Sequence, residues 1–401
     1  MKPEIKERIE QIKRGQVPEG YKKTKVGIVP DEWEVKRLRE NALIVDGTHQ
    51  TPRYTSNGVP FVSVENIGNI NNTDKYISNE DFEKYKVKPQ KNDILMTRIT
   101  AGIIGDTEII QNNNPLAYYV SLALIRVMRD YNVDFFNNFI GGFIFKKELN
   151  KRIIHTAFPK KINLNDIGEC KTVIPSLSEQ QKIADILSTQ DKIIELKEKL
   201  IDEKQKQKKY LMQMLLTGKK RLKGFDGEWK KVKLSEICSI STGNKDVKDK
   251  VSDGKYPFFV RSQKVERINT YSYNGEAILI PGDGKIGEIY HYIVGKFDFH
   301  QRVYKISDFR NCRGKFIYYY LLKFFKKRAL SMTAKATVDS LRMEILSKMN
   351  IVLPDLSEQI AIANILSTQD KEIELLQQDL EQEKQKKKAL MQLLLTGIVR
   401  V

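Results

Sequence analysis

Two stretches of this 401-residue chain decide its fold, because the second repeats the first. Residues 178–192 read SEQQKIADILSTQDK, and residues 357–371 read SEQIAIANILSTQDK. Around them, residues 173–218 align without a gap with residues 352–397, and 27 of the 46 aligned positions are identical. A duplication of this length indicates that the chain is built from two copies of one unit.

Both repeated segments are predicted to be long helices. Ser178 and Ser357 are the predicted N-caps, because a serine oxygen accepts a hydrogen bond from an amide of the first turn. Gly218 and Gly397 close the two segments and are typical of the position that ends a helix. Since residues 179–217 contain no glycine or proline, we expect a helix of 39 residues, about 58 Å long.

A narrow apolar seam runs along each predicted helix at every seventh residue. A long helix with one such seam and charged flanks is unstable alone, and each copy is the obvious partner for the other. We therefore expect an antiparallel coiled coil. The alternative is that each helix packs on its own globular region. The seam comprises Leu187, Ile194, Ile201 and Leu215 in the first copy and Leu366, Ile373, Leu380 and Leu394 in the second, with Lys208 and Lys387 interrupting it at equivalent positions.

A weaker repeat precedes each helix and defines two variable regions. The two tryptophans, Trp33 and Trp229, lie at equivalent places, and Pro60-Phe61 corresponds to Pro257-Phe258. We predict two mixed α/β domains joined by the two helices and related by an approximate two-fold axis. The expected order is a basic N-terminal segment (1–25), a first variable domain (26–172), a first helix (173–222), a second variable domain (223–351) and a second helix (352–401).

Strand-like and helix-like runs occur in both variable regions, which is the basis of the mixed α/β prediction. Aromatic and β-branched residues bounded by turn formers predict strands, and longer apolar runs without such breaks predict helices. The predicted strands are 58–64, 93–96, 118–127, 256–260, 277–280 and 289–294, and the predicted helices are 135–147 and 315–329.

Composition limits the class of protein. The hydrophobic fraction of 40 % is enough for packed cores, and neither a membrane-spanning run nor a secretory signal is expected. Three widely spaced cysteines (Cys170, Cys238 and Cys312) favour a reducing, cytoplasmic location over a disulfide framework. A formal net charge of +18 favours a polyanionic partner such as nucleic acid.

The excess positive charge is concentrated in one variable region. Residues 223–351 carry 25 Lys and Arg against 14 Asp and Glu, whereas residues 26–172 carry 19 against 18. Neutralisation of phosphates is therefore easily explained for the second region. In the first region, contacts with nucleic acid would have to come from a few placed residues.

Polar loop clusters at matching places in both regions are candidates for reading DNA bases. Arginine paired with guanine, and asparagine or glutamine paired with adenine, are the common major-groove contacts. Each cluster by itself is also compatible with an ordinary surface loop. The candidates are Thr48, His49, Gln50, Arg53, Ser63, Asn66 and Arg98 in the first region, and Asn244, Lys245, Arg261, Gln263, Lys264, Lys285, Gln301 and Arg302 in the second.

Signals for catalysis or metal binding are weak. Residues 282–287 read GDGKIG, which matches a dinucleotide-binding pattern, but a β-like run follows where that fold needs a helix. We therefore expect a hairpin there. The four histidines (His49, His155, His291 and His300) lack metal-ligand spacing. We expect no catalytic, cofactor or metal residues on this chain.

The alternation of two divergent regions with two nearly identical helices resembles the specificity subunit of type I restriction–modification systems. The motifs that carry the resemblance are PSLSEQ at 175–180 followed by IADIL at 183–187, and PDLSEQ at 354–359 followed by IANIL at 362–366. Trp33, Trp229 and the Gly-x-x-Gly loops at 102–105 and 284–287 support it. The resemblance covers nearly the whole chain.

The resemblance implies a non-catalytic DNA-binding subunit. Each variable region would be a target recognition domain that reads one half of a bipartite site in double-stranded DNA. The helices would set the spacing and dock two methyltransferase subunits. S-adenosylmethionine, ATP and Mg²⁺ would be bound by the partners, namely the methyltransferase and the restriction/translocase subunits, and not by this chain.

Two other classes of function remain open at this point. A coiled-coil scaffold with two protein-binding modules would show no salt-dependent DNA binding. A self-sufficient methyltransferase would bind S-adenosylmethionine as an isolated chain.

Overall fold

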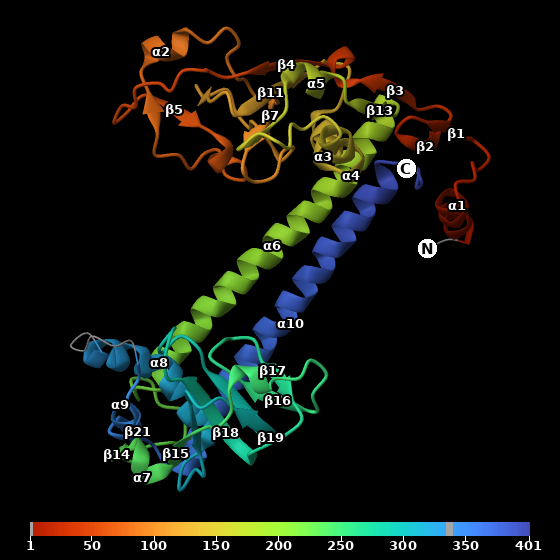
Figure 1. The fold of residues 1–401 in the computed structure, drawn as a ribbon. Coiled ribbons are helices and arrows are strands. Elements are labelled where there is room, and N and C mark those ends of the chain that lie inside the picture. Colours follow the sequence, from red (N-terminus) through yellow and green to blue (C-terminus); the bar gives the residue numbers. More distant parts are fainter. Residues whose placement is uncertain (1–2, 334–339) are drawn as a thin grey trace. The chain divides into compact units, whose positions relative to one another are not determined.

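A computed structural model describes residues 3–333 and 340–401 (Figure 1). The chain divides into two compact units. Unit 1 comprises Met1–Lys197 and Leu380–Val401, and unit 2 comprises Glu198–Asp379. The long helices α6 (Leu177–Leu215) and α10 (Leu356–Leu394), each of 39 residues, contribute one part to each unit. No helix among the described residues is both long enough and apolar enough to cross a membrane.

Unit 1 is a mixed α/β unit, as predicted. Its four-stranded sheet has the order β4-β11-β7-β9, and a three-stranded sheet has the order β10-β5-β6. The elements of unit 1 are α1 (Pro3–Lys13), β1 (Tyr21–Thr24), β2 (Gly27–Pro30), β3 (Glu34–Arg37), η1 (Leu38–Glu40), β4 (Ala42–Asp46), β5 (Val59–Val62), η2 (Val64–Asn66), β6 (Tyr76–Ile77), α2 (Asn79–Glu83), β7 (Ile94–Thr97), β8 (Ile99–Thr100), β9 (Thr107–Ile109), β10 (Ala117–Tyr118), β11 (Leu122–Val127), α3 (Val133–Gly141), α4 (Phe143–Asn150), β12 (Lys160–Lys161), α5 (Leu164–Gly168) and β13 (Lys171–Ile174).

Unit 2 repeats this plan with a single larger sheet. Its six strands have the order β15-β20-β18-β19-β16-β17, and β14 pairs with β21 as β3 pairs with β13. The elements are β14 (Lys230–Lys233), α7 (Leu234–Ile237), β15 (Ser239–Thr242), η3 (Val247–Asp249), β16 (Tyr256–Phe259), β17 (Glu266–Ile268), β18 (Tyr273–Pro281), β19 (His291–Phe299), β20 (Val303–Ser307), α8 (Gly314–Thr333), α9 (Met343–Ser347) and β21 (Asn350–Leu353).

A break in one strand explains why unit 1 has a four-stranded and a three-stranded sheet where unit 2 has one six-stranded sheet. In unit 2, β19 pairs with β18 and, at its end, in parallel with β16. In unit 1 the antiparallel pairing is made by β9, with β7, and the parallel pairing is made by β10, with β5. The segment Asn112-Asn113-Asn114-Pro115 separates the two strands, and proline and asparagine are poor strand residues.

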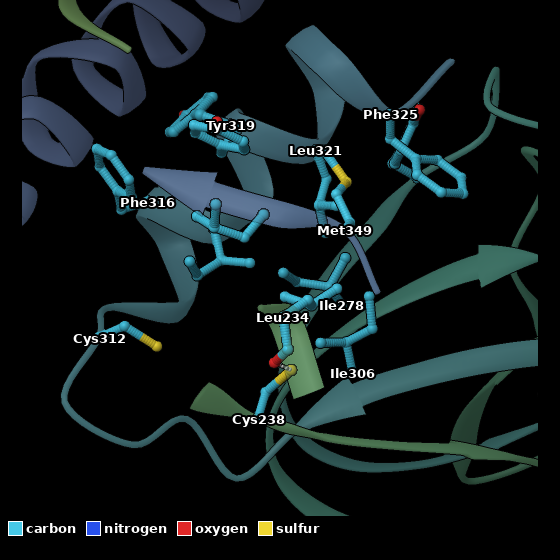
Figure 2. Close-up of a cluster of buried hydrophobic side chains, with 14 of the residues drawn as sticks. Leu234, Cys238, Ile278, Ile306, Cys312, Phe316, Tyr319, Leu321, Phe325 and Met349 are labelled. Atoms are coloured by element: carbon cyan, nitrogen blue, oxygen red, sulfur yellow. Dashed lines mark hydrogen bonds between the residues drawn. The ribbon is translucent and has the colours of Figure 1, made fainter. Parts of the chain in front are cut away.

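Each unit has its own hydrophobic core. In unit 2, α8 packs its aromatic side chains against β18, β20, β21 and the start of α10, and Figure 2 shows Phe316, Tyr319 and Phe325 in this cluster. In unit 1, α3 and α4 supply Phe135, Phe136, Phe139 and Phe145 to the equivalent core. One continuous helix was expected at 135–147, but the structure divides it at Gly142.

The long helices pair in antiparallel fashion in both units, which confirms the predicted coiled coil. In unit 1, Lys387 Nζ lies 2.5 Å from Asp191, and Lys197 lies 3.8 Å from Glu383. In unit 2, Lys204 Nζ lies 2.5 Å from Glu372, and Lys208 pairs with Asp370. Residue numbers rise along one helix and fall along the other. The predicted seam is buried at Leu187, Ile201, Leu215, Leu366, Ile373 and Leu394, and half-buried at Ile194 and Leu380.

The predicted N-caps were wrong by two residues. Both helices begin earlier, at Leu177 and Leu356. The amide of Glu179 donates to Ser176 Oγ at 3.3 Å, and the amide of Glu358 donates to Asp355 Oδ1 at 2.8 Å. Asp355 is the stronger cap because its oxygen carries a negative charge beside the positive end of the helix dipole.

A Trp–Glu–Arg cluster fixes the start of a long helix in each unit. In unit 1, Glu179 accepts from Trp33 Nε1 at 2.9 Å and from Arg400 at 2.6 and 3.0 Å. In unit 2, Glu358 accepts from Trp229 Nε1 at 3.2 Å and from Arg221 at 2.8 Å through both oxygens. Each cluster joins the first segment of a variable region, the start of one helix and the end of the other.

The N-terminal segment packs on the end of α10 within unit 1. Arg8 Nη1 donates to Ile398 O at 2.8 Å, and Tyr21 OH donates to Gly397 O at 2.7 Å. The sequence indicated no role for this basic segment. The structure shows that it satisfies carbonyl groups beyond the last turn of the helix.

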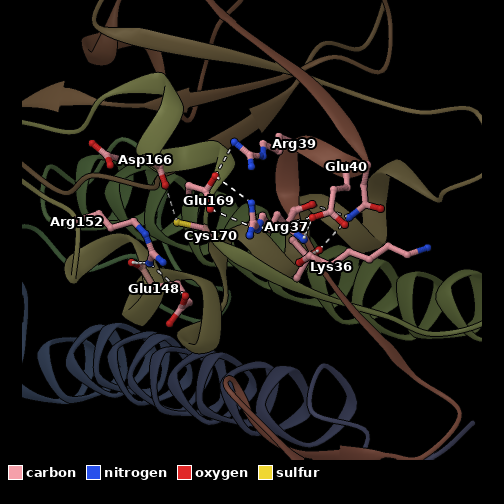
Figure 3. Close-up of polar contacts among 11 residues, drawn as sticks. Lys36, Arg37, Arg39, Glu40, Glu148, Arg152, Asp166, Glu169 and Cys170 are labelled. Carbon is pink, nitrogen blue, oxygen red and sulfur yellow. Dashed lines mark hydrogen bonds and ion pairs between the residues drawn. The ribbon is translucent and has the colours of Figure 1, made fainter.

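A second set of ion pairs holds the edges of the variable region of unit 1 together (Figure 3). Glu169 at the end of α5 lies 2.6 Å from Arg39 and 3.4 Å from Arg37. Next to it, Cys170 Sγ donates to Asp166 O at 3.4 Å. These contacts join the antiparallel pair β3 and β13, so the loops beyond β4 project from a fixed base.

Candidate nucleic-acid interface

Predicted loops meet beside the ends of neighbouring strands in each unit. In unit 1, the loop after β4 forms a parallel bridge between Thr48 and Tyr119, next to the ends of β5 and β10. In unit 2, the loop after β15 forms the equivalent bridge between Lys245 and His300, next to the ends of β16 and β19. The polar loops that occupy matching places in the two halves of the sequence therefore also occupy matching places in the two folded units.

A glycine allows this convergence in both units. A Cβ atom on Gly47 would lie 1.9 Å from Tyr118 O, and one on Gly243 would lie 2.0 Å from Phe299 O. No side chain fits at either position without moving the backbone. The residues that follow, Thr48-His49 and Asn244-Lys245, are thereby held against the neighbouring strand.

The loops of unit 2 gather two arginines around one carboxylate. Arg261, two residues beyond β16, and Arg302, directly before β20, both donate from Nη1 to Asp283 Oδ2 at 3.0 Å. Asp283 lies in residues 282–290, which connect β18 to the antiparallel strand β19. This confirms the hairpin expected for the glycine-rich pattern, and the element that follows it is a strand.

His300 belongs to the same cluster. Its Nδ1 accepts from the Arg302 amide at 2.9 Å, and its Nε2 lies 3.8 Å from Asp246. Burial, followed by the charge of Arg261, lowers the pKa of His300. Hydrogen bonding from the Lys248 amide lowers the pKa of Asp246, which also accepts from Gln301 Nε2 at 3.2 Å. At neutral pH the histidine is uncharged and the carboxylate is ionised.

The remaining candidates of unit 2 lie on its surface. Asn244, Gln263, Lys264 and Lys285 are exposed. Lys264 Nζ lies 3.6 Å from Glu266. Together with the two arginines they give this end of unit 2 a positive and hydrogen-bonding surface, which is the character that a DNA backbone and base edges require.

In unit 1 the first predicted loop lines a cleft of about 970 Å³. The lining of the cleft is part polar and part apolar, and it carries both signs of charge. Its lining includes the candidates Thr48, His49, Gln50 and Arg53, the basic residues Lys84 and Lys86, and the acidic residues Asp46, Glu80 and Asp81. His49 Nε2 lies 3.1 Å from Asp46.

Three other candidates of unit 1 have contacts that fix the loops. Arg98 is buried, and its guanidinium donates to Asp46 at 2.9 Å, to Val120 O at 2.8 Å and to Ile162 O at 3.2 Å. Burial lowers the pKa of Arg98, and the charge of Asp46 opposes this effect. In this position Arg98 supports the loops from inside, and the donors that make these contacts are directed at groups of the protein.

Asn66 closes the loop that contains Ser63. Its Oδ1 accepts from the Ser63 amide at 3.0 Å, and its Nδ2 donates to Asn72 O at 3.3 Å. Both ends of the amide are therefore used within the protein. Ser63 is half-buried and caps the short helix η2.

The acidic residues at the centres of the two loop clusters, Asp46 and Asp283, were missed by the sequence reasoning. Asp46 holds His49 and Arg98, and Asp283 holds Arg261 and Arg302. A signal was available, since Asp283 is the only acidic residue within the glycine-rich 282–287 segment. A carboxylate repels the phosphates of DNA, so neither aspartate fitted the pattern expected of a DNA-binding loop. Within residues 3–333 and 340–401, no group of three or more His, Cys, Asp or Glu side chains is placed to hold a metal ion.

Comparison with known proteins gives a consistent result. The model of the family described as the type I restriction modification DNA specificity domain matches residues 30–223 and 226–384. The chain is 28 % identical to the MjaX type I restriction enzyme specificity subunit of Methanocaldococcus jannaschii, over 96 % of this chain and 97 % of that protein. It is 33 % identical to the EcoDI specificity subunit of Escherichia coli, over 42 % of this chain and 37 % of that protein.

Two solved structures have a similar fold. The S subunit of a type I restriction–modification system from M. genitalium aligns with a TM-score of 0.62 at 14 % identity, covering 90 % of this chain and 96 % of that one. A chain from a study of complex assembly and conformational transition in a type I system aligns with a TM-score of 0.59 at 17 % identity, covering 92 % and 99 %.

Proposed function

The chain belongs to the type I restriction modification DNA specificity family, and from that premise we propose that each of its units reads one half of a bipartite DNA sequence. The family is the non-catalytic component of restriction–modification systems, so the chain supplies specificity to an enzyme whose chemistry lies elsewhere. The polyanionic partner suggested by the net charge of +18 is then double-stranded DNA.

The observation that carries the proposal is the recurrence of one loop cluster with different side chains. Thr48-His49 in unit 1 and Asn244-Lys245 in unit 2 occupy equivalent places beside a parallel strand end. The scaffold of each cluster is the same, whereas its hydrogen-bonding groups differ. Such a pair is suited to reading two different half-sites of one duplex.

We further propose that the long helices set the distance between half-sites and dock two identical methyltransferase subunits. Support comes from apolar side chains that lie half-exposed at the same places in both helices. Leu177 corresponds to Leu356, and Leu196 corresponds to Leu375. A surface repeated in both copies, on a chain whose other surfaces diverged, fits two copies of one partner. S-adenosylmethionine, ATP and Mg²⁺ are assigned to these partners and to the restriction/translocase subunits.

A footprint with the assembled complex tests the proposal. The chain together with its methyltransferase partner should protect two short sequences separated by an unread spacer. Protection of one contiguous site would contradict the proposal that each unit reads one half-site. Absence of any salt-dependent DNA binding would instead favour a scaffold for proteins. Saturable binding of S-adenosylmethionine to the isolated chain would identify a self-sufficient methyltransferase.

The role of the helices has its own test. Insertion of seven residues after Ile194 and after Ile373 preserves the heptad seam and lengthens each helix by about 10 Å, or about three base pairs of B-DNA. The protected half-sites should stay unchanged while the spacer grows. If the half-sites themselves changed, the helices would be reading bases.

A further inference from the structure

The pair Arg261 and Arg302 is held by a residue that is itself almost covered. The side chain of Asp283 is 12 % exposed, whereas those of Arg261 and Arg302 are 44 % and 64 % exposed. Both arginines use the same carboxylate oxygen, each at 3.0 Å. The carboxylate is therefore placed behind the two guanidinium groups, which face solvent.

The backbone around Asp283 is fixed by several hydrogen bonds. The amide of Gly282 donates to Arg302 O at 2.8 Å, and the amide of Leu341 donates to Gly282 O at 2.6 Å. The Arg302 amide in turn donates to His300 Nδ1 at 2.9 Å. Arg261 directly follows Val260 beyond a strand of the six-stranded sheet. Both arginines therefore start from rigid positions.

This arrangement reduces the freedom of the arginines before any partner binds. An exposed arginine loses much side-chain entropy when it docks on a base, and a shared carboxylate removes part of that loss in advance. Each guanidinium has five N–H donors, and the contact with Asp283 uses one nitrogen. The planar fork of an arginine matches the O6 and N7 acceptors of guanine.

We propose that Asp283 is a positioning residue for DNA recognition by unit 2, holding Arg261 and Arg302 as one pre-formed pair that reads guanine. The inference rests on the proposed function and deepens it. Asp283 acts through the arginines and does not touch DNA. Since its negative charge lies close to the phosphates, its removal should strengthen non-specific binding while weakening discrimination between sequences.

The test uses the assembled complex with Asp283→Asn, which keeps the shape of the side chain and removes its charge. Affinity is measured for the cognate site, and for sites in which each base pair of either half is exchanged in turn. We expect discrimination at the guanines of the unit 2 half-site to fall about tenfold. The unit 1 half-site should be read as before, and affinity for random DNA should be equal or higher.

Asp253→Asn is the matched control, because it makes the same charge change at an exposed carboxylate of unit 2 outside this contact. If Asp283→Asn discriminated as well as the unchanged complex, the inference would be wrong. An equal loss at both half-sites, or lower affinity for random DNA, would also overturn it, since either result indicates a general structural role.

A second pair of variants keeps the inference testable if Asp283→Asn fails to fold. Arg261→Lys and Arg302→Lys retain the charges but lose the fork, so they should lower discrimination at the same base pairs. If neither lysine variant alters the unit 2 half-site, the inference is overturned. Failure of the unchanged complex to protect an interrupted site would reject the proposed function itself, which is a separate result.

Discussion

Unit 1 and unit 2 share their framework and differ in the surface that the framework carries. The Trp–Glu–Arg cluster recurs in both, with Glu179 and Glu358 accepting from a tryptophan and from Nε and Nη2 of an arginine. The loop clusters, by contrast, hold His49 and Arg98 around one aspartate and a pair of arginines around the other. The contacts that join the helices and the loop side chains that differ thus lie in separate parts of each unit.

The shared cluster is nevertheless not equally buried. Trp33 is fully buried in unit 1, whereas Trp229 is only partly buried in unit 2. In unit 1 the tryptophan and the arginine of the cluster, Trp33 and Arg400, lie far apart in the sequence, whereas in unit 2 Arg221 and Trp229 lie within one short segment. The glutamate is distant in sequence from both of its partners in either unit. Unit 1 therefore assembles the cluster from three separate segments, and unit 2 from two.

The largest effect is expected from removing the tryptophans. Trp33→Ala should destabilise unit 1 by about 3–5 kcal/mol, and Trp229→Ala should destabilise unit 2 by less, since less surface returns to water. Burial raises the pKa of Cys170 and Cys238 to about 12 and that of Cys312 to about 11, so the folded thiols resist alkylation.

The thiols therefore report on each unit separately. Alkylation along a urea gradient, read by mass spectrometry, follows unit 1 through Cys170 and unit 2 through Cys238 and Cys312. We expect Trp33→Ala to lower the midpoint for Cys170 by more than Trp229→Ala lowers it for the other two. Equal shifts would show that the difference in burial has no energetic consequence.

The glycines that end the long helices offer a second comparison, with a smaller effect. Gly218 and Gly397 both have left-handed φ angles, of 68° and 69°. A Cβ atom on Gly397 would lie 2.5 Å from Pro30, whereas one on Gly218 would lie 3.6 Å from the Trp229 ring. Gly218→Ala should cost about 1 kcal/mol through the backbone alone, and Gly397→Ala about twice that.

The same alkylation midpoints measure both glycine variants. The backbone penalty is common to the two positions. The difference between the two losses of stability therefore measures the contact with Pro30. A larger loss for Gly218→Ala would contradict the packing of unit 1 against the end of α10.

The framework could be predicted from the sequence because it is repeated there. The heptad seam, the helix-ending glycines and the paired tryptophans recur at constant offsets, and their chemistry is local or periodic. The predicted caps Ser178 and Ser357 were wrong because a serine two residues earlier and an aspartate two residues earlier also satisfy the capping pattern. Sequence spacing does not distinguish between neighbouring polar residues of this kind.

The site could be predicted only as a set of loops. That Thr48 would lie beside Tyr119, and Lys245 beside His300, depends on a parallel strand pairing between segments that are far apart in the sequence. The burial of Arg98 could not be foreseen either, because its partners Asp46, Val120 and Ile162 come from three separate segments. Tertiary contacts decide whether an arginine is a support or a surface group.

The stability of unit 2 is expected to depend more strongly on pH than that of unit 1, and this effect is of intermediate size. Both histidines of unit 2 are buried, and both of unit 1, His49 and His155, are exposed. Burial lowers the pKa of His291 and of His300 below the ordinary value of about 6.5. Below this pH the two histidines are protonated more readily in the unfolded chain than in folded unit 2. The free energy of unfolding of unit 2 is therefore highest above about pH 7 and falls as the pH drops through 6.5.

The charged groups around His300 modify this trend without reversing it. Asp246 and Asp283 favour its protonated form, whereas Arg261 and Arg302 oppose it. We expect the unit 2 thiols to become reactive at a lower urea concentration at pH 5.5 than at pH 7.5. His291→Gln should flatten the trend and His155→Gln should not. A greater pH sensitivity in unit 1 would refute this assignment.

The smallest effect is expected at the lysines that interrupt the seam, where the two units are most alike. Lys208 pairs with Asp370 in unit 2, and Lys387 pairs with Asp191 in unit 1, each pair being partly exposed. Ion pairs of this exposure contribute about 0–1 kcal/mol, and leucine at the same position would bury more apolar surface. Lys208→Leu and Lys387→Leu should therefore each change stability by less than about 1 kcal/mol. Asp370 keeps a second partner, since Tyr319 OH donates to it at 2.6 Å.

A polar residue at a core position of a coiled coil fixes its register at some cost in stability. The double variant Lys208→Leu with Lys387→Leu should therefore keep both half-sites but relax the distance between them. Binding of the assembled complex to a series of sites with different spacers measures this directly. The unchanged complex should prefer one spacer length, and the double variant should accept neighbouring lengths. Retention of a single spacer would show that the apolar seam alone sets the register, and that the two lysines serve only solubility.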